Sequence, residues 1–112
     1  MEGCSVKYAL DVLSGKWKLY IMYVLSTHTQ IRFNELQRQV GNISATMLSK
    51  NLQELEDAHL IVRHEYKEIP PHVEYSLSDI GRKLTPALES LGEWGHSLYL
   101  LNKGMNNTTT IR

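Results

Sequence analysis

The hydrophobic pattern of the chain changes its period at Leu60, and this change limits the possible folds more than any other feature. Before Leu60, apolar residues recur at steps of three and four, which is typical of amphipathic helices. From Leu60 to Leu77 they alternate in two runs separated by Pro70 and Pro71. Proline cannot donate a hydrogen bond to a sheet, so both prolines belong at the tip of a hairpin. The pattern predicts an α+β domain, mostly α, in which helices precede a hairpin.

Cap and turn residues divide the first half of the chain into helices. Ser5, Asn34 and Ser44 are suited to cap helices, and Gly15 and Gly41 are suited to the turns that end them. The predicted helices cover residues 5–13, 16–26, 34–40 and 45–58, and residues 31–33 are a candidate for a very short strand. The sheet has three strands if that segment pairs and two if it does not.

The last apolar segment is a long helical region with a proline inside it. Ser78 caps the region, which runs from Asp79 to about Leu101. Because proline interrupts helix hydrogen bonding, the helix either kinks at Pro86 or stops and restarts with Thr85 as the cap.

One apolar stripe in this region extends beyond what a small domain needs for its own core. It consists of Leu84, Leu88, Leu91, Trp94, Leu98 and Leu101. Residues 102–112 are polar and are expected to form a flexible tail. We therefore expect one domain over residues 1–101, and we interpret the stripe and the N-terminal helix as a homodimer interface rather than an internal core.

Composition excludes several classes of function. The 112 residues suit one domain, and the single cysteine excludes an intrachain disulfide, which fits a reducing, cytoplasmic location. Neither a membrane span nor a signal peptide is expected. The five histidines are scattered, and no phosphate loop or nucleophile motif occurs. We therefore expect no metal, no cofactor and no enzyme activity.

Charge is balanced overall but not along the chain. Residues 1–50 hold six basic and three acidic side chains, whereas residues 51–112 hold six basic and nine acidic ones. Any surface that binds nucleic acid must therefore be a local patch on one face. Solvated charge without a binding role is the alternative interpretation.

Residues 34–58 form a candidate helix-turn-helix, and the hairpin after it makes the predicted fold a winged helix-turn-helix. The major groove of DNA admits one α-helix, so a reading helix needs one apolar face in the core and one free polar face. The helix over residues 45–58 has this division. Its outward residues are Ala45, Thr46, Ser49, Lys50 and Gln53. A solvated helix in a domain that does not bind DNA is the alternative.

The sequence resembles the HxlR family of bacterial winged-helix regulators, which are related to the MarR group. The matching segments span residues 4–98 and are CSVKY at Cys4, GKWK at Gly15, RFNEL at Arg32, IS and ML at Ile43 and Met47, LQELE at Leu52, PPHVEYSL at Pro70, LSDIGRKL around Gly81, and EWG at Glu93. The resemblance implies a homodimeric transcription regulator, a repressor, that binds a pseudo-palindromic operator in double-stranded DNA. A twofold dimer would place two reading helices about 34 Å apart, one turn of DNA.

Candidate DNA contacts follow from this fold and are divided by role. Candidate phosphate contacts are Lys16, Lys18, Arg32 and Lys50, together with the helix start at Ser44 and Ala45. Candidate base contacts are Thr46, Ser49, Lys50 and Gln53. In the wing, Lys67 and His72 flank the tip, whereas Arg63 faces either DNA or an acidic neighbour in an ion pair. Trp17 and Trp94 lie on apolar stripes, which favours core or interface positions.

Cys4 is a candidate sensing residue. It stands just before the Ser5 cap, where the partial positive charge of the helix and nearby Lys7 favour a thiolate. The resemblance implies a thiol that responds to electrophiles or disulfide stress. An inert, partly buried cysteine is the alternative. A winged-helix module that binds protein instead of DNA is the competing function.

Overall fold

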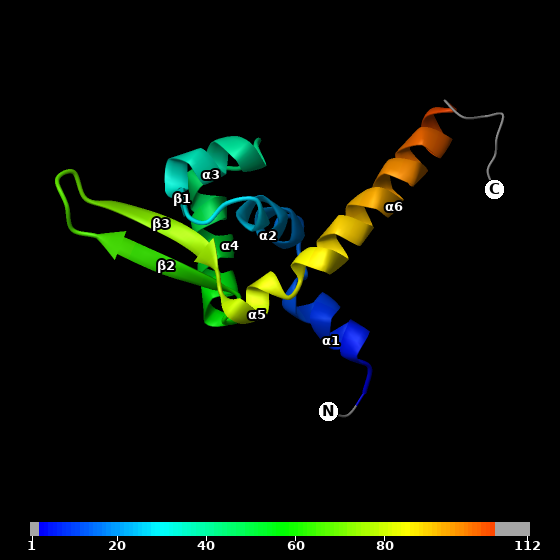
Figure 1. The fold of residues 1–112 in the computed structure, drawn as a ribbon, viewed down its shortest axis with the longest axis horizontal. Coiled ribbons are helices and arrows are strands. Elements are labelled where there is room, and N and C mark those ends of the chain that lie inside the picture. The colour runs from blue at the N-terminus through cyan, green and yellow to red at the C-terminus, as the bar shows by residue number, and fades with distance from the viewer. Residues whose placement is uncertain (1–2, 105–112) are drawn as a thin grey trace.

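A hairpin and a long helix project from opposite sides of a helical body (Figure 1). The computed structural model describes residues 3–104. Its elements in chain order are α1 (Ser5–Val12), α2 (Lys18–Ser26), β1 (Ile31–Arg32), α3 (Phe33–Val40), α4 (Ala45–Asp57), β2 (Ile61–Tyr66), β3 (His72–Leu77), α5 (Asp79–Arg82) and α6 (Thr85–Lys103). This is the predicted α+β, mostly helical, winged helix-turn-helix.

The core lies where α2, α3 and α4 meet. The largest fully buried side chains are Ile21, Met22, Leu25, Leu36, Leu48, Leu52 and Leu55. Helix α2 supplies three of them because it is apolar on most sides, as expected of a central helix. This core holds α3 and α4 in place, so the outward face of α4 is presented by a rigid support.

The sheet is antiparallel and three-stranded, in the order β1-β3-β2. In the hairpin, Ile61 pairs with Leu77 and Tyr66 pairs with His72, which places Pro70 and Pro71 in the connecting tip. Strand β1 adds only the pairs of residues 31 and 32 with β3. The three-stranded form of the prediction is therefore confirmed, and the third strand is one residue shorter than expected.

Several helix starts differ from the predicted ones. Helix α2 begins at Lys18, with Trp17 at the N-cap position, rather than at Lys16. Helix α3 begins at Phe33, so Asn34 lies inside it and is not its cap. Phe33 packs against the core, and this contact favours a helix that starts directly where β1 ends. At α1, the N-cap position belongs to Cys4 rather than Ser5.

The C-terminal region stops and restarts, which was the second of the two predicted alternatives. Helix α5 ends before Leu84, and α6 begins at Thr85 with Pro86 in its first turn. Thr85 is therefore the first helical residue and not the cap. Helix α6 continues to Lys103 and is closed by Gly104 in the left-handed conformation, φ 70°. Residues 102 and 103, which were predicted to belong to the tail, are the last two residues of α6. Residues 105–112 of the predicted tail lie outside the described part.

Within residues 3–104, no helix combines the length and the apolar character that crossing a membrane requires.

Candidate nucleic-acid interface

Helix α4 begins with the predicted serine cap. The Ser44 hydroxyl accepts a hydrogen bond from the backbone N–H of Met47 at 3.0 Å. An N-cap of this kind satisfies one of the free N–H groups of the first turn and fixes where the helix starts. The remaining N–H groups and the helix dipole make this end favourable for a phosphate oxygen.

The two faces of α4 are as different as a groove-reading helix requires. Leu48, Leu52 and Leu55 are buried in the core, so Leu48, and not the exposed Met47, takes the first inward position. The outward side chains are exposed: Ala45, Thr46, Ser49, Lys50 and Gln53. No described part of the chain covers this face, and its small and hydrogen-bonding side chains allow close approach to bases.

One polar residue of α4 points inward and was missed in the sequence. Asn51 is buried, and its Nδ2 donates to the carbonyl oxygen of Met47 at 2.9 Å. The bond returns to the residue four positions earlier, a pattern that asparagine forms readily inside helices. Asn51 adjoins the outward face of α4, but its side chain bonds within the helix and faces the core.

In the wing, the carboxylate of Glu74 is the common partner of several polar side chains. Gln30 Nε2 donates to its Oε1 at 2.8 Å, His72 Nε2 lies 3.0 Å from its Oε2, and Arg32 Nε lies 3.8 Å away. These contacts, chiefly the Gln30 hydrogen bond, lower the pKa of Glu74. The side chain of His72 is therefore held beside Glu74 and is only 13% exposed, although it lines the hollow between α4 and the wing, and its contact with DNA stays a prediction. Lys67 is exposed beside the tip, as predicted.

Two lysines near α4, Lys18 and Lys50, share Glu54 as their ion-pair partner. Lys18 Nζ lies 2.6 Å from Glu54 Oε1, and its side chain is only 12% exposed. This ion pair lowers the pKa of Glu54. A contact of Lys18 with a phosphate would have to replace this ion pair, and it stays a prediction. Lys50 is 67% exposed and 4.0 Å from the other Glu54 oxygen, so it can turn to a phosphate.

A hollow between α4 and the wing brings the other candidates together. Arg32, Ser49, Arg63 and the two tip prolines line it. Arg63 Nη1 lies 2.6 Å from Glu65 Oε2, so the predicted acidic-neighbour alternative holds for Arg63. Lys16 precedes α2 apart from this hollow, and its ammonium lies 4.8 Å from the ring centre of Trp17.

The apolar stripe of α6 is divided between two environments. Leu84 and Leu88 pack against the core of the same chain, which corrects their assignment to a dimer interface. Leu91, Trp94, Leu98 and Leu101 are exposed, with Trp94 at 63%. Helix α1 has no buried residue, and Val6, Tyr8 and Leu10 are exposed on it.

Cys4 is a free, exposed thiol at the start of α1. It occupies the N-cap position, and its side chain makes no cap hydrogen bond. Across residues 3–104, no group of three or more histidine, cysteine or acidic side chains is arranged to hold a metal ion.

Comparison with known proteins matches residues 12–103 to the family described as HxlR-like helix-turn-helix. An uncharacterised HTH-type transcriptional regulator of Halalkalibacterium halodurans is 50% identical over 88 residues, which cover 79% of this chain and 78% of that protein.

Solved structures show the same fold. The redox regulator HypR in its reduced form has a TM-score of 0.82 and 38% identity, over 90% of this chain and 99% of that one. A protein of Porphyromonas gingivalis W83 assigned to the MarR family of transcriptional regulators has a TM-score of 0.80 and 35% identity, over 86% of this chain and 93% of that one.

Proposed function

The chain belongs to the HxlR-like helix-turn-helix family of transcriptional regulators, and from this membership we propose that it is a homodimeric repressor that binds a specific DNA operator in the cytoplasm. The observation that carries the proposal is the uncovered polar face of α4, capped at Ser44 and held over a buried leucine face. A wing with an exposed Lys67 stands beside it.

Each part of this surface has a distinct role in the proposed complex. Thr46, Ser49 and Gln53 meet base edges in the major groove, since their side chains can donate and accept hydrogen bonds. Gln53 must exchange its present bond to Asp57 Oδ1, at 2.9 Å, for a base contact. The phosphate contacts are Lys50, Arg32, Lys16 and the N-terminus of α4 at Ser44 and Ala45. Lys67 follows the backbone or the minor groove from the wing.

A twofold dimer supplies the second reading helix. The exposed apolar side chains of α1 and of the outer half of α6 form a surface of the kind that marks protein contacts. A pseudo-palindromic site would match two α4 helices about 34 Å apart.

The test is a gel shift with DNA selected from a random pool, at several salt concentrations. For Lys50→Met, the slope of log affinity against log salt becomes shallower by about 0.9 for each phosphate that the protein no longer neutralises. Lys83→Met is the matched control and leaves the slope unchanged, because Lys83 is exposed at the end of α5, which lies against Leu60 beyond the C-terminal end of α4. Equal slopes for wild type and Lys50→Met would contradict the phosphate role of Lys50.

The same experiment separates DNA binding from a protein-interaction module. A regulator gives a sequence-selective shift that weakens steeply with salt. Absence of any shift, even at low salt, would favour the interaction module.

We also propose that Cys4 makes the regulator responsive to thiol-reactive compounds. The thiol is exposed, and a structural relative is a redox regulator. The sequence has no second cysteine, so the response is alkylation, a mixed disulfide with a small thiol, or a Cys4–Cys4 bond between two copies. Cys4→Ser should bind DNA normally but no longer respond to diamide or a quinone. A response that persists in Cys4→Ser would remove Cys4 from the mechanism.

A further inference from the structure

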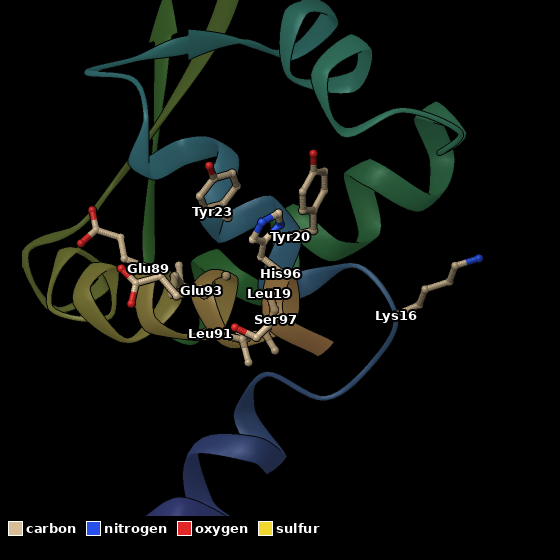
Figure 2. A pocket seen from close by; sticks show the side chains of 11 residues that line it. Lys16, Leu19, Tyr20, Tyr23, Glu89, Leu91, Glu93, His96 and Ser97 are labelled. Atoms are coloured by element: carbon tan, nitrogen blue, oxygen red, sulfur yellow. The ribbon is translucent and has the colours of Figure 1, made fainter. Parts of the chain in front are cut away.

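The hollow between α4 and the wing has a basic lining. Its volume is about 550 Å³, and Arg32, Arg63 and His72 contribute to its walls. No carboxylate among residues 3–104 lines it. The groove between α2 and α6 differs, because Glu89 and Glu93 lie along it (Figure 2). A phosphate of the DNA backbone therefore suits the hollow beside α4 and is repelled from the groove beside α6.

The two arginines of the hollow are held in different ways. Arg63 Nη1 lies 2.6 Å from Glu65 Oε2, so an outer nitrogen of its guanidinium is already occupied. Arg32 is paired through its inner nitrogen instead, because its Nε lies 3.8 Å from Glu74 Oε2. The side chain of Arg32 is 60% exposed. Its two outer nitrogens form the planar fork that can hold a phosphate with two parallel hydrogen bonds.

The backbone places Arg32 beside Glu74. The two residues are partners across the β1–β3 ladder, so their side chains lie on the same face of the sheet. Strand β1 has only two residues, and α3 begins directly after it. The main chain of Arg32 is therefore fixed between a strand and a helix, and within residues 3–104 Glu74 is the acidic side chain that pairs with it.

The carboxylate of Glu74 is itself fixed at both oxygens. Gln30 Nε2 donates to Oε1 at 2.8 Å, and His72 Nε2 lies 3.0 Å from Oε2. Gln30 Nε2 also donates to the hydroxyl of Tyr66 at 2.8 Å, and the ring of Tyr66 stacks on that of His72 with centres 4.9 Å apart. The pKa of Glu74 is lowered, chiefly by the Gln30 bond, so the carboxylate is ionised at neutral pH. These contacts give Arg32 a rigid, negatively charged support.

We propose that Glu74 is a positioning residue for DNA binding, which holds the Nε side of Arg32 so that the outer nitrogens are oriented for a backbone phosphate in the hollow. The inference rests on the proposed DNA binding and assigns a carboxylate a role in it. A free arginine side chain must be ordered when DNA binds, which costs about two- to tenfold in affinity. Glu74 orders Arg32 before the DNA arrives, although its own charge repels phosphate.

A double-mutant cycle with DNA selected from a random pool tests this role, with dissociation constants measured at several salt concentrations. Glu74→Gln keeps the size of the side chain and removes its charge. It should weaken binding about two- to tenfold, because Arg32 is no longer ordered in advance. Its slope of log affinity against log salt should stay close to wild type, since Arg32 still reaches the phosphate. Arg32→Met should make that slope shallower by about 0.9.

The decisive comparison is Glu74→Gln in the Arg32→Met background. There it should leave binding unchanged or tighten it, because only the repulsion of the carboxylate is left to remove. Equal weakening in both backgrounds would show that Glu74 acts through the fold of the wing, and would overturn the inference. Tightening in both backgrounds would overturn it as well, because Glu74 would then only repel DNA.

Glu68→Gln is the control with the same change of charge. Glu68 is exposed beside the wing tip, and it forms no ion pair with another of residues 3–104. Its replacement removes a negative charge near DNA without changing the support of Arg32. Glu68→Gln should therefore bind DNA as tightly as wild type or more tightly.

A measurement without DNA separates the inference from the proposed function. In the free protein, the ¹⁵N relaxation of the Arg32 Nε–H group should show a restrained side chain, and Glu74→Gln should make it mobile. Arg63, which is paired with Glu65, is the internal reference and should not change. Equal mobility of Arg32 in the wild type and in Glu74→Gln would overturn the inference even if the wild type binds DNA. A restrained Arg32 in a chain that binds no DNA would instead refute the proposed function.

Discussion

Replacing Gly81 by alanine should destabilise the domain, because this glycine lies against backbone. Gly81 is buried in α5, and a Cβ added there would lie 2.2 Å from the carbonyl oxygen of Leu60. That oxygen accepts the backbone N–H of Ser78 at 3.0 Å, and the Ser78 hydroxyl donates to the carbonyl of His59 at 2.7 Å. The methyl group would therefore enter where hydrogen bonds connect the start of α5 to the segment between α4 and β2.

The expected size follows from two opposing terms. Overpacking costs about 1–3 kcal/mol, and the upper part applies because a backbone carbonyl cannot rotate away as a side chain can. Alanine regains up to about 1 kcal/mol over glycine inside a helix. The net loss is about 1–2 kcal/mol, and in a domain of this size each kcal/mol lowers the melting temperature by about 4–8 °C.

Urea and thermal unfolding followed by circular dichroism, at one protein concentration, measure this difference. Gly95→Ala in α6 is the matched control, since nothing lies within 4 Å of its added Cβ. It should raise stability by about 0.5–1 kcal/mol through helix propensity. If Gly81→Ala were as stable as Gly95→Ala, the close approach of α5 to Leu60 would be wrong.

Two further predictions concern the ends of helices α3 and α4. Ser44→Ala should lower the free energy of unfolding by about 1 kcal/mol, because the α4 cap is lost. Ser44→Thr should keep most of the stability that the cap contributes. Equal urea midpoints for Ser44→Ala and wild type would contradict the cap. Hydrogen bonds from Arg38 and then Gln39 lower the pKa of Glu35 from 4.5 to about 2, so its contribution to stability is present above pH 4.5 and is lost as the pH falls towards 2. Arg38→Gln should reduce the loss of stability measured by urea titrations between those pH values, and an unchanged pH dependence would refute the pairing.

The sequence predicted those features that depend on local periodicity and capping. The Ser44 cap, the leucine face of α4 and the prolines at the hairpin tip all follow from residues close together in the chain. Contacts between distant residues were not predictable in this way. Lys18 and Glu54 are 36 residues apart, and only the folded structure, which brings the start of α2 next to Glu54 of α4, shows that this lysine is paired.

The same limit applies to contacts within the wing and at α6. His72 flanks the tip in sequence, but its side chain is held by Glu74 within the strand. The stripe on α6 is continuous in sequence, but Leu84 and Leu88 belong to the core because α6 leaves the body only after its first turns (Figure 1). A periodic pattern shows that a face is apolar and leaves open what covers it.

The proposed function depends above all on two α4 helices that occupy successive major grooves of one DNA duplex. Hydroxyl-radical footprinting of the protein on DNA selected from a random pool measures this arrangement. We expect two protected segments related by twofold symmetry, with centres about 34 Å apart, and loss of both when Ser49 and Gln53 are replaced by glutamate. Protection that is unsymmetrical, or that survives this double replacement, would show that α4 does not read DNA in this way.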